Sequence, residues 1–322
     1  MTAPKHARRL SVVIPVLNEQ DSLKQLCEEV VENAARSVKE GRIAAYEIWF
    51  VDDGSTDASP RIISDLAGAH EQVNAIFFRK NFGKACALQA GFRHAGGDLV
   101  LTMDADLQDN PLEISRFISA ADKGFDLVSG WKVNRRDSLE KRLPSKVFNS
   151  VICKLFGIRL HDCNCGFKLY RKELADSLDI YGGMHRYIPV LAASKGFRIT
   201  EIAVAHRKRA FGKSKYGWGR YFHGFFDLLM ILFLTRYGEK PMHFFGKAAL
   251  VLLGIGFCLA LYGVAAGSFY AGMLAVLCVV SGVHFFGLGF IAEALLNASY
   301  HSRYTEDHIR EIICKKEKKT AG

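Results

Sequence analysis

The sequence predicts an α/β protein with a mostly parallel sheet that carries helices on both faces, followed by a helical hairpin long enough to cross a membrane. Strand-like and helix-like segments alternate over residues 1–220, which is typical of a sheet built with right-handed crossovers. Residues 248–292 contain no Asp, Glu, Lys or Arg, which predicts the hairpin. The strand-like ranges are 10–15, 47–52, 74–79, 99–104 and 126–130, and the helix-like ranges are 19–39, 59–69, 84–94 and 111–123.

The uncharged stretch 248–292 fits two spanning helices, because each needs about 20 apolar residues and a turn over 265–272 divides the stretch. A buried hairpin in a soluble core is the alternative, but soluble helices of this length normally carry a polar stripe. Positive residues mark the cytoplasmic side of a membrane. They flank the stretch on both sides: Lys240 and Lys247 before it, and Arg303, Arg310, Lys315, Lys316, Lys318 and Lys319 after it. We therefore expect a multi-pass protein of the cytoplasmic membrane with both termini in the cytosol.

The preceding segment 221–237 is apolar but is interrupted by Asp227, which leaves it too short to span a bilayer. With Arg220 and Arg236 near its ends, it predicts an amphipathic helix in the membrane interface. A core helix of the soluble domain is the alternative. The expected organisation is a globular cytosolic domain 1–220, an interfacial helix and linker 221–242, two transmembrane helices 243–300, and a basic cytosolic tail 301–322.

Composition limits the functional classes. The formal net charge is +10, which suggests nucleic acid, an anionic membrane surface or phosphorylated substrates as partners. The eight cysteines are scattered, and the spacing of Cys163 and Cys165 fits neither a zinc knuckle nor a redox pair, so we expect reduced thiols. The sequence has no Gly-x-Gly-x-x-Gly after the first strand and no P-loop motif, which argues against dinucleotide oxidoreductases and P-loop NTPases.

Two carboxylates follow the fourth predicted strand. Asp104 and Asp106 come at the end of the apolar run 99–103, and Gln108 follows them. Unpaired buried charge is costly, so these side chains belong at the carboxyl edge of the sheet, where open α/β sheets bind ligands. Their hard oxygen atoms suit a Mg²⁺ or Mn²⁺ ion that bridges phosphates. A solvated acidic turn is the alternative.

Polar residues also follow the first two predicted strands, on the same edge of the sheet. The first strand runs into Pro15, Asn18 and Glu19, and the second ends in Asp52 and Asp53. The second group has a simpler alternative, namely a turn and helix cap with Asp57 as the N-cap residue.

Together these segments resemble the family 2 glycosyltransferases of GT-A fold, and more narrowly the polyprenyl-phosphate glycosyltransferases. The resemblance covers almost the whole of residues 1–220 and extends to the two-helix carboxyl end. It is carried by Ile14-Pro15-x-x-Asn18-Glu19, Val51-Asp52-Asp53-Gly54-Ser55-Thr56-Asp57, Asn81-Phe82-Gly83-Lys84, Asp104-Ala105-Asp106-Leu107-Gln108-Asp109-Asn110-Pro111, Asp162-x-x-Cys165-Gly166-Phe167-Lys168 and Arg209-x-x-Gly212-x-Ser214-Lys215-Tyr216.

The resemblance implies roles for several residues. The metal ligands would be Asp104, Asp106 and Gln108, holding Mg²⁺ or Mn²⁺ on the donor diphosphate. The nucleotide pocket would contain Pro15, Asn18, Glu19, Asp52, Asp53, Lys84 and Asp104. Many members have Ser-Gly-Phe-Arg where this chain has Cys165-Gly166-Phe167-Lys168; Lys168 keeps the charge but lacks the two-pronged guanidinium.

Two basic segments, 132–146 and 203–226, are candidates for binding the phosphate of a lipid acceptor. Attraction to anionic lipids is the alternative, and nucleic acid is a third; no nucleic-acid module is recognisable, so no nucleic acid partner is expected. Because arginine holds phosphate best, the expected acceptor residues are led by Arg135, Arg142 and Arg209, with Lys215 and Lys168 in support. Arg135 and Arg209 are also expected to act in catalysis, with Asp104 and Asp106.

The expected function is transfer of a hexose-type sugar from a nucleotide diphosphate sugar, UDP before GDP, to polyprenyl phosphate with inversion. The alternatives are a processive polysaccharide synthase and a catalytically silent membrane scaffold of the same fold. The first usually carries Gln-x-x-Arg-Trp, which this chain lacks. The glycine pairs 254/256 and 287/289 would permit a homo-oligomer through close helix packing.

Overall fold

The computed structural model describes residues 8–133, 152–205, 207, 219–238, 240–299 and 309–313. The chain divides into two compact units, one formed by Met1–Arg220 with Tyr304–Gly322 and the other by Tyr221–Arg303.

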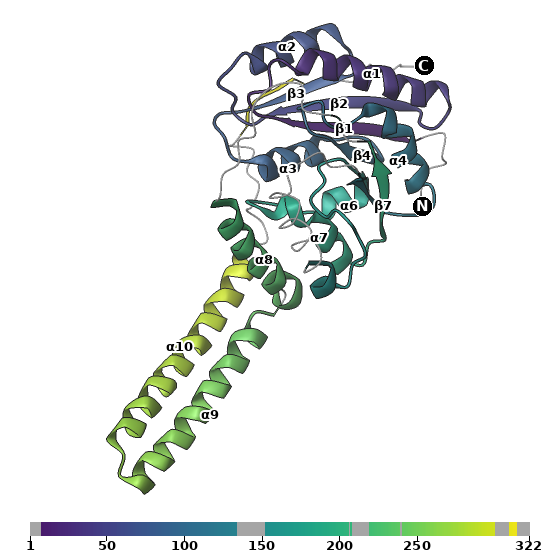
Figure 1. The fold of residues 1–322 in the computed structure, drawn as a ribbon. Helices are drawn as coiled ribbons and strands as arrows, with labels where there is room; N and C mark the ends of the chain where they lie inside the picture. The colour runs from purple at the N-terminus through teal and green to yellow at the C-terminus, as the bar shows by residue number, and fades with distance from the viewer. Residues whose placement is uncertain are drawn as a thin grey trace. The chain divides into compact units, whose positions relative to one another are not determined.

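The first unit is built on one mixed sheet with the strand order β7-β5-β6-β4-β1-β2-β3-β8 (Figure 1). The pairs β1–β2, β2–β3, β1–β4 and β5–β7 are parallel, whereas β6 is antiparallel to β4 and β5. The predicted α/β fold class is confirmed. The strands are β1 Arg9–Val16, β2 Ala45–Asp52, β3 Val73–Phe78, β4 Leu99–Thr102, β5 Leu127–Lys132, β6 Lys168–Arg171, β7 Ile199–Val204 and β8 Ile309–Ile313.

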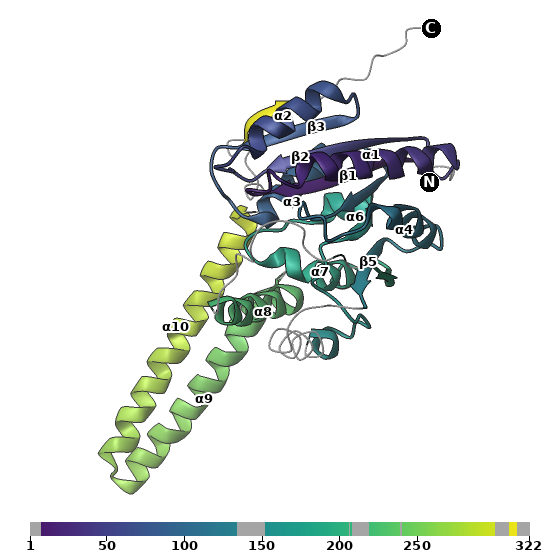
Figure 2. The same ribbon diagram turned by 45° about the horizontal axis from the view of Figure 1, so that its top comes forward.

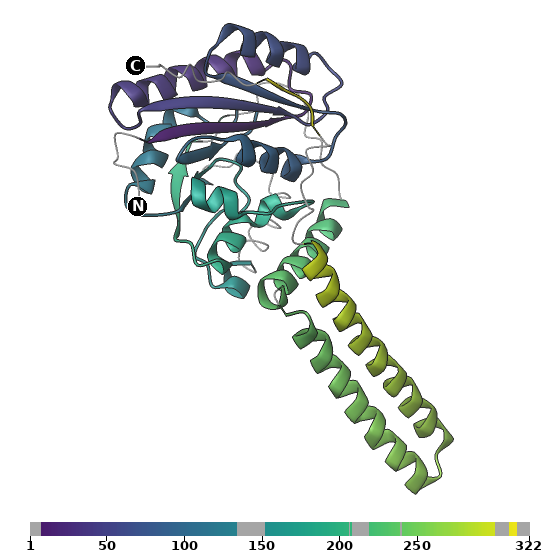
Figure 3. The ribbon, with the colours of Figure 1, turned by 180° about the vertical axis from the view of Figure 1, so that it is seen from behind.

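Helices cover both faces of this sheet, as Figures 1 and 3 show from opposite sides. On one face, α1 packs beside α2 and α4, and its residues Leu23, Leu26 and Val30 join Val12 and Ile14 of β1 in the core. On the other face, Val13 of β1 lies directly against α3. This explains why the central strands are mostly apolar rather than alternating between apolar and polar residues. The helices of the unit are α1 Leu23–Lys39, α2 Ser59–Ala69, α3 Lys84–His94, α4 Ile114–Ala121, α6 Lys172–Ser177 and α7 Ile188–Ser194, with 3-10 turns η2 Pro111–Glu113 and η3 Met184–Tyr187.

The structure differs from the expectation at several elements. The fourth strand ends at Thr102, so Asp104 lies beyond the strand rather than within it. The predicted helix 111–123 is a 3-10 turn followed by a shorter helix, and α1 begins at Leu23 rather than 19. Elements β6, β7, α6 and α7 were not predicted, because they are only four to seven residues long and carry little periodicity.

The last strand, β8, was also missed. It lies within the range expected to be a basic tail, but it pairs antiparallel with β3, with Ile312 opposite Ile76 (Figure 2). It therefore covers one edge of the sheet, where unpaired N–H and C=O groups would otherwise be exposed.

The second unit contains α8 Gly219–Tyr237, α9 Met242–Ala266 and α10 Phe269–Ser299. Met242–Ala266 and Phe269–Leu295 are long and apolar enough to cross a membrane, with mean hydropathies of 2.3 and 2.2. Only 11% and 17% of their most apolar windows are buried, which is unlike the core helices of a soluble protein. Phe233 of α8 packs against Phe244 and Phe245 of α9, so α8 contributes to this unit.

Glycines bring α9 and α10 together. A β-carbon at Gly256 would lie 2.9 Å from the Val279 side chain, and one at Gly282 would lie 2.9 Å from Leu253. A β-carbon at Gly289 would meet Met242, whereas nothing lies within 4 Å of such a carbon at Gly254 or Gly287. Gly256 and Gly289 are thus packed within the hairpin. Of the two glycine pairs, Gly254 and Gly287 remain for the predicted packing with a second copy.

Candidate active site

The acidic loop, residues 103–109, begins where β4 ends and is held by packing rather than by regular hydrogen bonding. Leu107 is 3% exposed and belongs to the core, yet its φ is +60°. This conformation costs an L-residue roughly 1–2 kcal/mol, which burial of the side chain offsets. Within the turn, the Asp106 carboxylate accepts the backbone N–H of Gln108 at 3.2 Å. The loop therefore places all three predicted metal ligands on one tight turn.

Asp104 lies at the entrance to this turn and is fully ionised. The ammonium group of Lys84, at the first residue of α3, forms an ion pair with the Asp104 carboxylate. Burial opposes ionisation, but Lys84, Lys132 and Lys168 outweigh it and hold the pKa of Asp104 at about 2. Asp104 is thus a carboxylate throughout the neutral range, as a metal ligand must be.

Asp109 supports the backbone at Asp104. Its side chain is 1% exposed, and one carboxylate oxygen accepts the backbone N–H of Asp104 at 3.2 Å. The other oxygen lies 3.0 Å from the Lys132 ammonium at the end of β5. Burial lowers the pKa of Lys132, but the attraction of Asp109 dominates and raises it overall. Asp109 is therefore a buried support of the acidic loop, which the sequence alone did not distinguish from an exposed acid.

The turn before β6 closes over Asp104. A β-carbon at Gly166 would lie 2.7 Å and 2.8 Å from the two Asp104 carboxylate oxygens, so any side chain there would have to displace the carboxylate. The Thr102 hydroxyl donates to the Gly166 carbonyl at 2.7 Å and fixes this turn to the end of β4. The close approach of Gly166 to Asp104 is thus set by contacts between β4 and the turn, and not by local sequence.

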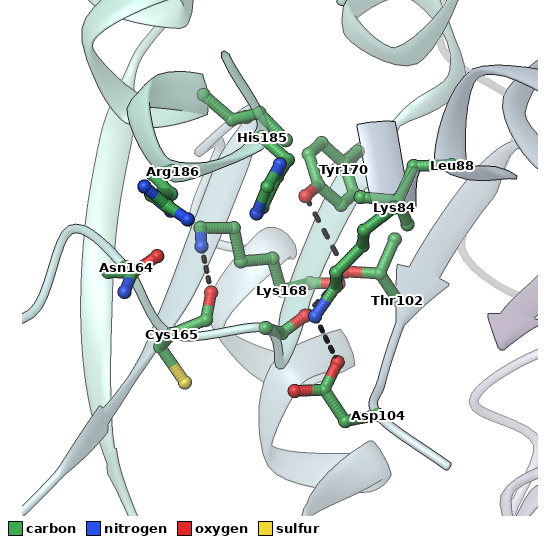
Figure 4. A pocket seen from close by; sticks show the side chains of 12 residues that line it. Lys84, Leu88, Thr102, Asp104, Asn164, Cys165, Lys168, Tyr170, His185 and Arg186 are labelled. Atoms are coloured by element: carbon green, nitrogen blue, oxygen red, sulfur yellow. Dashed lines mark hydrogen bonds and ion pairs between the residues drawn. The ribbon is translucent and has the colours of Figure 1, made fainter. Parts of the chain in front are cut away.

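A pocket of about 140 Å³ opens beside Asp104 (Figure 4). Lys84 and Asp104 form one end of it, and β4, β6, α3 and η3 supply its walls. Its lining residues are Lys84, Leu88, Thr102, Asp104, Asn164, Cys165, Gly166, Lys168, Tyr170, His185, Arg186 and Ile188.

Lys168, expected to bind a phosphate, lines this pocket and is 2% exposed. Its ammonium group donates to the Cys165 carbonyl. Burial lowers the pKa of Lys168 most strongly, with opposing contributions from the thiols and carboxylates nearby. Lys168 therefore belongs to the pocket floor rather than to an exposed basic surface.

His185 and Arg186 were missed by sequence reasoning, because they lie on a short 3-10 turn that no recognised motif marks. Burial, followed by the nearby Lys84 and Arg186 charges, lowers the pKa of His185 to about 3. The imidazole is therefore neutral at physiological pH, so it can hydrogen-bond a ligand without adding charge.

The residues expected to line a nucleotide pocket lie at the ends of β1 and β2, and the two loops bind each other. The Asn18 carboxamide oxygen accepts the Thr56 N–H at 2.7 Å, and the Asn18 N–H donates to the Ser55 hydroxyl at 2.8 Å. The Glu19 N–H donates to the Ser59 hydroxyl at 3.0 Å. Pro15 pairs with Val51 in the sheet. These contacts align the two loops at the same edge of the sheet as the acidic loop.

Asp52 and Asp53 end β2 and are both buried. Asp52 accepts the Ser55 N–H at 3.2 Å, and Asp53 accepts the N–H groups of Phe82 and Gly83 at 2.8 and 3.0 Å. Asp53 thus fixes the turn that leads into Lys84. Asp57, the predicted cap, accepts the Ser59 N–H at 2.9 Å, although the helix itself begins one residue later than that prediction implies.

A pH-dependent contribution of Asp53 to stability follows. Burial raises its pKa from 3.8 to about 6, despite the lowering effect of the two N–H groups. Between these values the folded protein retains a proton that the unfolded chain has lost, so the contribution of Asp53 to stability falls as pH rises through this window. Relative to Asp53→Asn, the wild type should lose roughly 2–3 kcal/mol between pH 4 and 7.

Thermal unfolding of both proteins at the two pH values measures this difference. Asp65→Asn, which changes an exposed carboxylate of α2, is the control and should show no such divergence from the wild type. Parallel pH dependence of the wild type and Asp53→Asn would contradict the assignment.

Four predicted acceptor residues, Arg135, Arg142, Arg209 and Lys215, lie outside the described residues. Their neighbour Arg207 is described, and it is tied to the acidic loop. The Arg207 N–H donates to the Gln108 carbonyl at 3.0 Å, and its guanidinium donates to Asn110 at 2.7 Å and to Glu29 at 2.6 Å. The second basic segment, 203–226, is therefore bound to the acidic loop at Arg207.

Comparison with known proteins agrees with this arrangement. Residues 11–179 match the family model described as Glycosyl transferase family 2. The chain is 35% identical to a dodecaprenyl-phosphate galacturonate synthase of Rhizobium johnstonii over 96% of its own length and 94% of the relative. It is 36% identical to an undecaprenyl-phosphate 4-deoxy-4-formamido-L-arabinose transferase of Klebsiella pneumoniae, over 89% of this chain and 88% of that one.

Among solved structures, the fold is similar to glucosyl-3-phosphoglycerate synthase of Mycobacterium tuberculosis. The complex of that protein with phosphoglyceric acid superposes with a TM-score of 0.54 at 21% identity, covering 72% of this chain and 81% of the other. Its complex with Mn²⁺, UDP and glucosyl-3-phosphoglycerate gives the same TM-score at 19% identity and the same coverage. At this identity the likeness concerns the fold alone.

Proposed function

Because the chain belongs to glycosyl transferase family 2, we propose that it is a membrane-bound enzyme that transfers a hexose-type sugar from a nucleotide diphosphate sugar, UDP rather than GDP, to polyprenyl phosphate. The observation that carries the proposal is the acidic loop at the carboxyl edge of the sheet, next to a pocket lined by cations. The full-length similarity to two polyprenyl-phosphate sugar transferases supports it.

Asp104, Asp106 and Gln108 would hold a Mg²⁺ or Mn²⁺ ion. The described residues contain no group of three or more His, Cys, Asp or Glu suited to a metal. Two carboxylates and an amide oxygen nevertheless fit these ions, which usually keep further positions for water and substrate phosphates. When bound, the ion supplies Lewis-acid neutralisation of the departing nucleotide diphosphate.

The side chains of the protein supply charge and position. Lys84 is held at the start of α3 beside Asp104, where its ammonium can face a donor phosphate. The acceptor phosphate has its second pKa near 6 and is mostly dianionic at neutral pH. The phosphate oxygen can therefore attack without help from a strong general base. When that oxygen is aligned with the anomeric carbon, a single displacement inverts the configuration there.

Arg135, Arg142, Arg209, Lys215 and Lys168 are proposed to receive the acceptor phosphate. The hydrogen bond between the Arg207 N–H and the Gln108 carbonyl supports this for the second basic segment, because it holds Arg207 of that segment against the acidic loop. Arg135 and Arg209 would then neutralise the attacking oxygen in catalysis.

The helices α9 and α10 are proposed to anchor the enzyme as a two-span hairpin in the cytoplasmic membrane. The first unit of the chain contains residues on both sides of the hairpin in sequence, including β8 after α10. Both ends of the hairpin must then lie on one side of the bilayer. The flanking lysines and arginines favour the cytosolic side.

Substitution of Gly166 tests the site geometry. Gly166→Ala should lower transfer by about tenfold to a hundredfold, because the new methyl group displaces the Asp104 carboxylate by a fraction of an ångström or more. Gly68→Ala on α2, where nothing lies within 4 Å of the added carbon, is the matched control and should leave transfer unchanged. Equal activity of the two variants would show that Asp104 is not held by this contact.

The decisive experiment incubates membranes containing the protein with a panel of nucleotide sugars and undecaprenyl phosphate, with mass spectrometry of the lipids. The expected product is a lipid with one phosphate and one sugar, formed only when divalent metal is present. A polymer of sugars would favour a processive synthase. No product with any donor would favour a silent scaffold and overturn the proposal.

A further inference from the structure

Arg207 joins three parts of the first unit that are far apart in the sequence. It lies in the stretch after β7, and its guanidinium donates to the Asn110 side chain at 2.7 Å and to the Glu29 carboxylate of α1 at 2.6 Å. The other Glu29 oxygen accepts the Gln25 side-chain amide at 2.9 Å. The side chains of Arg207 and Glu29 are only 36% and 23% exposed, so this pair is better shielded from water than an ordinary surface pair. Glu29 therefore balances the charge of Arg207 and fixes its side chain against α1.

The main chain of the same stretch is bound to residues 108–113. The Arg207 N–H donates to the Gln108 carbonyl at 3.0 Å. Two residues earlier, the Ala205 N–H donates to the Glu113 carboxylate at 3.4 Å, and Glu113 is buried. The stretch after β7 is thus attached at two points to the segment that contains the last predicted metal ligand.

A further contact concerns the Gln108 side chain itself. Its amide nitrogen lies 3.5 Å from the Arg207 carbonyl oxygen, which makes a long hydrogen bond. A carbonyl attracts the NH₂ end of an amide and repels its oxygen, so this contact selects one of the two orientations of the side chain. In that orientation the Gln108 oxygen, rather than the nitrogen, is left for a cation, as the proposed metal site requires.

We propose that Arg207 and Glu29 are positioning residues for the divalent ion. The contacts of Arg207 with Glu29 and Asn110 hold the Arg207 carbonyl in place, and that carbonyl orients the Gln108 amide. The inference rests on the proposed function and deepens it, because it adds to the metal site two residues that do not touch the ion. Removal of a group that orients a metal ligand typically weakens metal binding by about tenfold to a hundredfold. Because the Arg207 side chain acts through its own carbonyl, we expect an effect at the lower end of this range.

The test measures binding of Mn²⁺, in the presence of UDP, to the full-length protein in detergent, from the paramagnetic resonance signal of free Mn²⁺. Arg207→Met should weaken binding by about tenfold, and Glu29→Gln by about threefold, because the amide keeps an acceptor. Arg207→Lys should recover part of the loss, since the charge returns without the planar fork. Arg36→Met breaks an exposed ion pair with Glu32 on α1 and is the matched control, which should bind Mn²⁺ like the wild type.

A double variant shows whether Arg207 acts through Gln108. Gln108→Ala removes the proposed ligand and should weaken Mn²⁺ binding by about tenfold or more. Adding Arg207→Met to Gln108→Ala should then cost no more than about a further twofold, because the group that Arg207 orients is gone. A merely structural role of Arg207 would give the same loss in both backgrounds.

Transfer assays supply a second measurement. Arg207→Met should raise the Mn²⁺ concentration that gives half the maximal rate by about tenfold. The KM for undecaprenyl phosphate should stay within about threefold of the wild type, because the Arg207 charge is already balanced by Glu29.

Unchanged Mn²⁺ binding by Arg207→Met, at an unfolding temperature equal to that of the wild type, would overturn the inference and leave the proposed function intact. A raised KM for undecaprenyl phosphate with unchanged Mn²⁺ binding would also overturn it and assign Arg207 to the acceptor. If Arg207→Met does not fold, Glu29→Gln decides by the same measurements.

The proposed function fails in a different way. A wild type that binds no Mn²⁺ would refute the proposed metal site together with this inference. A wild type that binds Mn²⁺ but transfers no sugar from any donor would refute the proposed transfer alone, and the Mn²⁺ titrations of the variants would still decide the role of Arg207.

Discussion

Asp104→Asn should lower sugar transfer by about a thousandfold or more while leaving the fold intact. The substitution keeps the shape of the side chain but removes the charge that would hold the divalent ion and that Lys84 faces. Lewis-acid stabilisation of a leaving group is worth several kcal/mol, and each ~1.4 kcal/mol is a factor of ten in rate. The measurement is the initial rate of lipid-linked sugar formation at saturating Mn²⁺ and donor.

Asp65→Asn serves as the control for charge, since it removes a carboxylate from an exposed position on α2 and should retain full activity. The unfolding temperature of Asp104→Asn is measured in parallel, so that loss of activity is not mistaken for loss of structure. Transfer within tenfold of the wild type would rule out Asp104 as a metal ligand.

Lys132→Met should destabilise the catalytic unit by about 3–5 kcal/mol, the cost of leaving one partner of a buried ion pair alone. Lys132 and Asp109 have side chains that are 10% and 1% exposed, and their ammonium and carboxylate lie 3.0 Å apart. For a unit of this size, that cost corresponds to a fall of roughly 6–20 °C in unfolding temperature. Differential scanning fluorimetry in detergent measures it.

The double variant Asp109→Asn with Lys132→Met separates the pair from other effects of the substitution. It removes both charges, so it should recover a good part of the lost unfolding temperature. Its transfer rate should still be low, because the neutral amide that replaces the Asp109 carboxylate would hold the Asp104 N–H less well. A double variant no more stable than Lys132→Met alone would show that the pair does not control stability.

Much of this fold could be predicted from the sequence, because the central strands and helices have strong hydrophobic patterns. The runs that became β1, β2 and β3 are mostly apolar, and α1 repeats its apolar residues at helical spacing, so their positions were predicted to within a few residues. The elements β6, β7 and β8 were missed because short strands are stabilised by their neighbours in the sheet rather than by local sequence.

The acidic loop and the nucleotide edge were also accessible from the sequence, because their polar residues directly follow apolar strands. Much of the pocket beside Asp104 was not. Lys168 of β6 and His185 and Arg186 of η3 come from elements that are separated in the sequence and that only the folded chain brings to one pocket. The contact of Gly166 with Asp104 was hidden for the same reason, because a glycine requires close packing only where another segment approaches it.

The position of β8 has a consequence for biosynthesis. The ribosome makes the strand that completes the edge of the sheet beside β3 only after both apolar helices have been synthesised. During translation the earlier strands can fold, but β3 has no outer neighbour until residues 309–313 emerge. Synthesis of the apolar hairpin therefore precedes completion of the sheet, so a nascent chain stalled before residue 309 carries an open strand edge that is prone to aggregation.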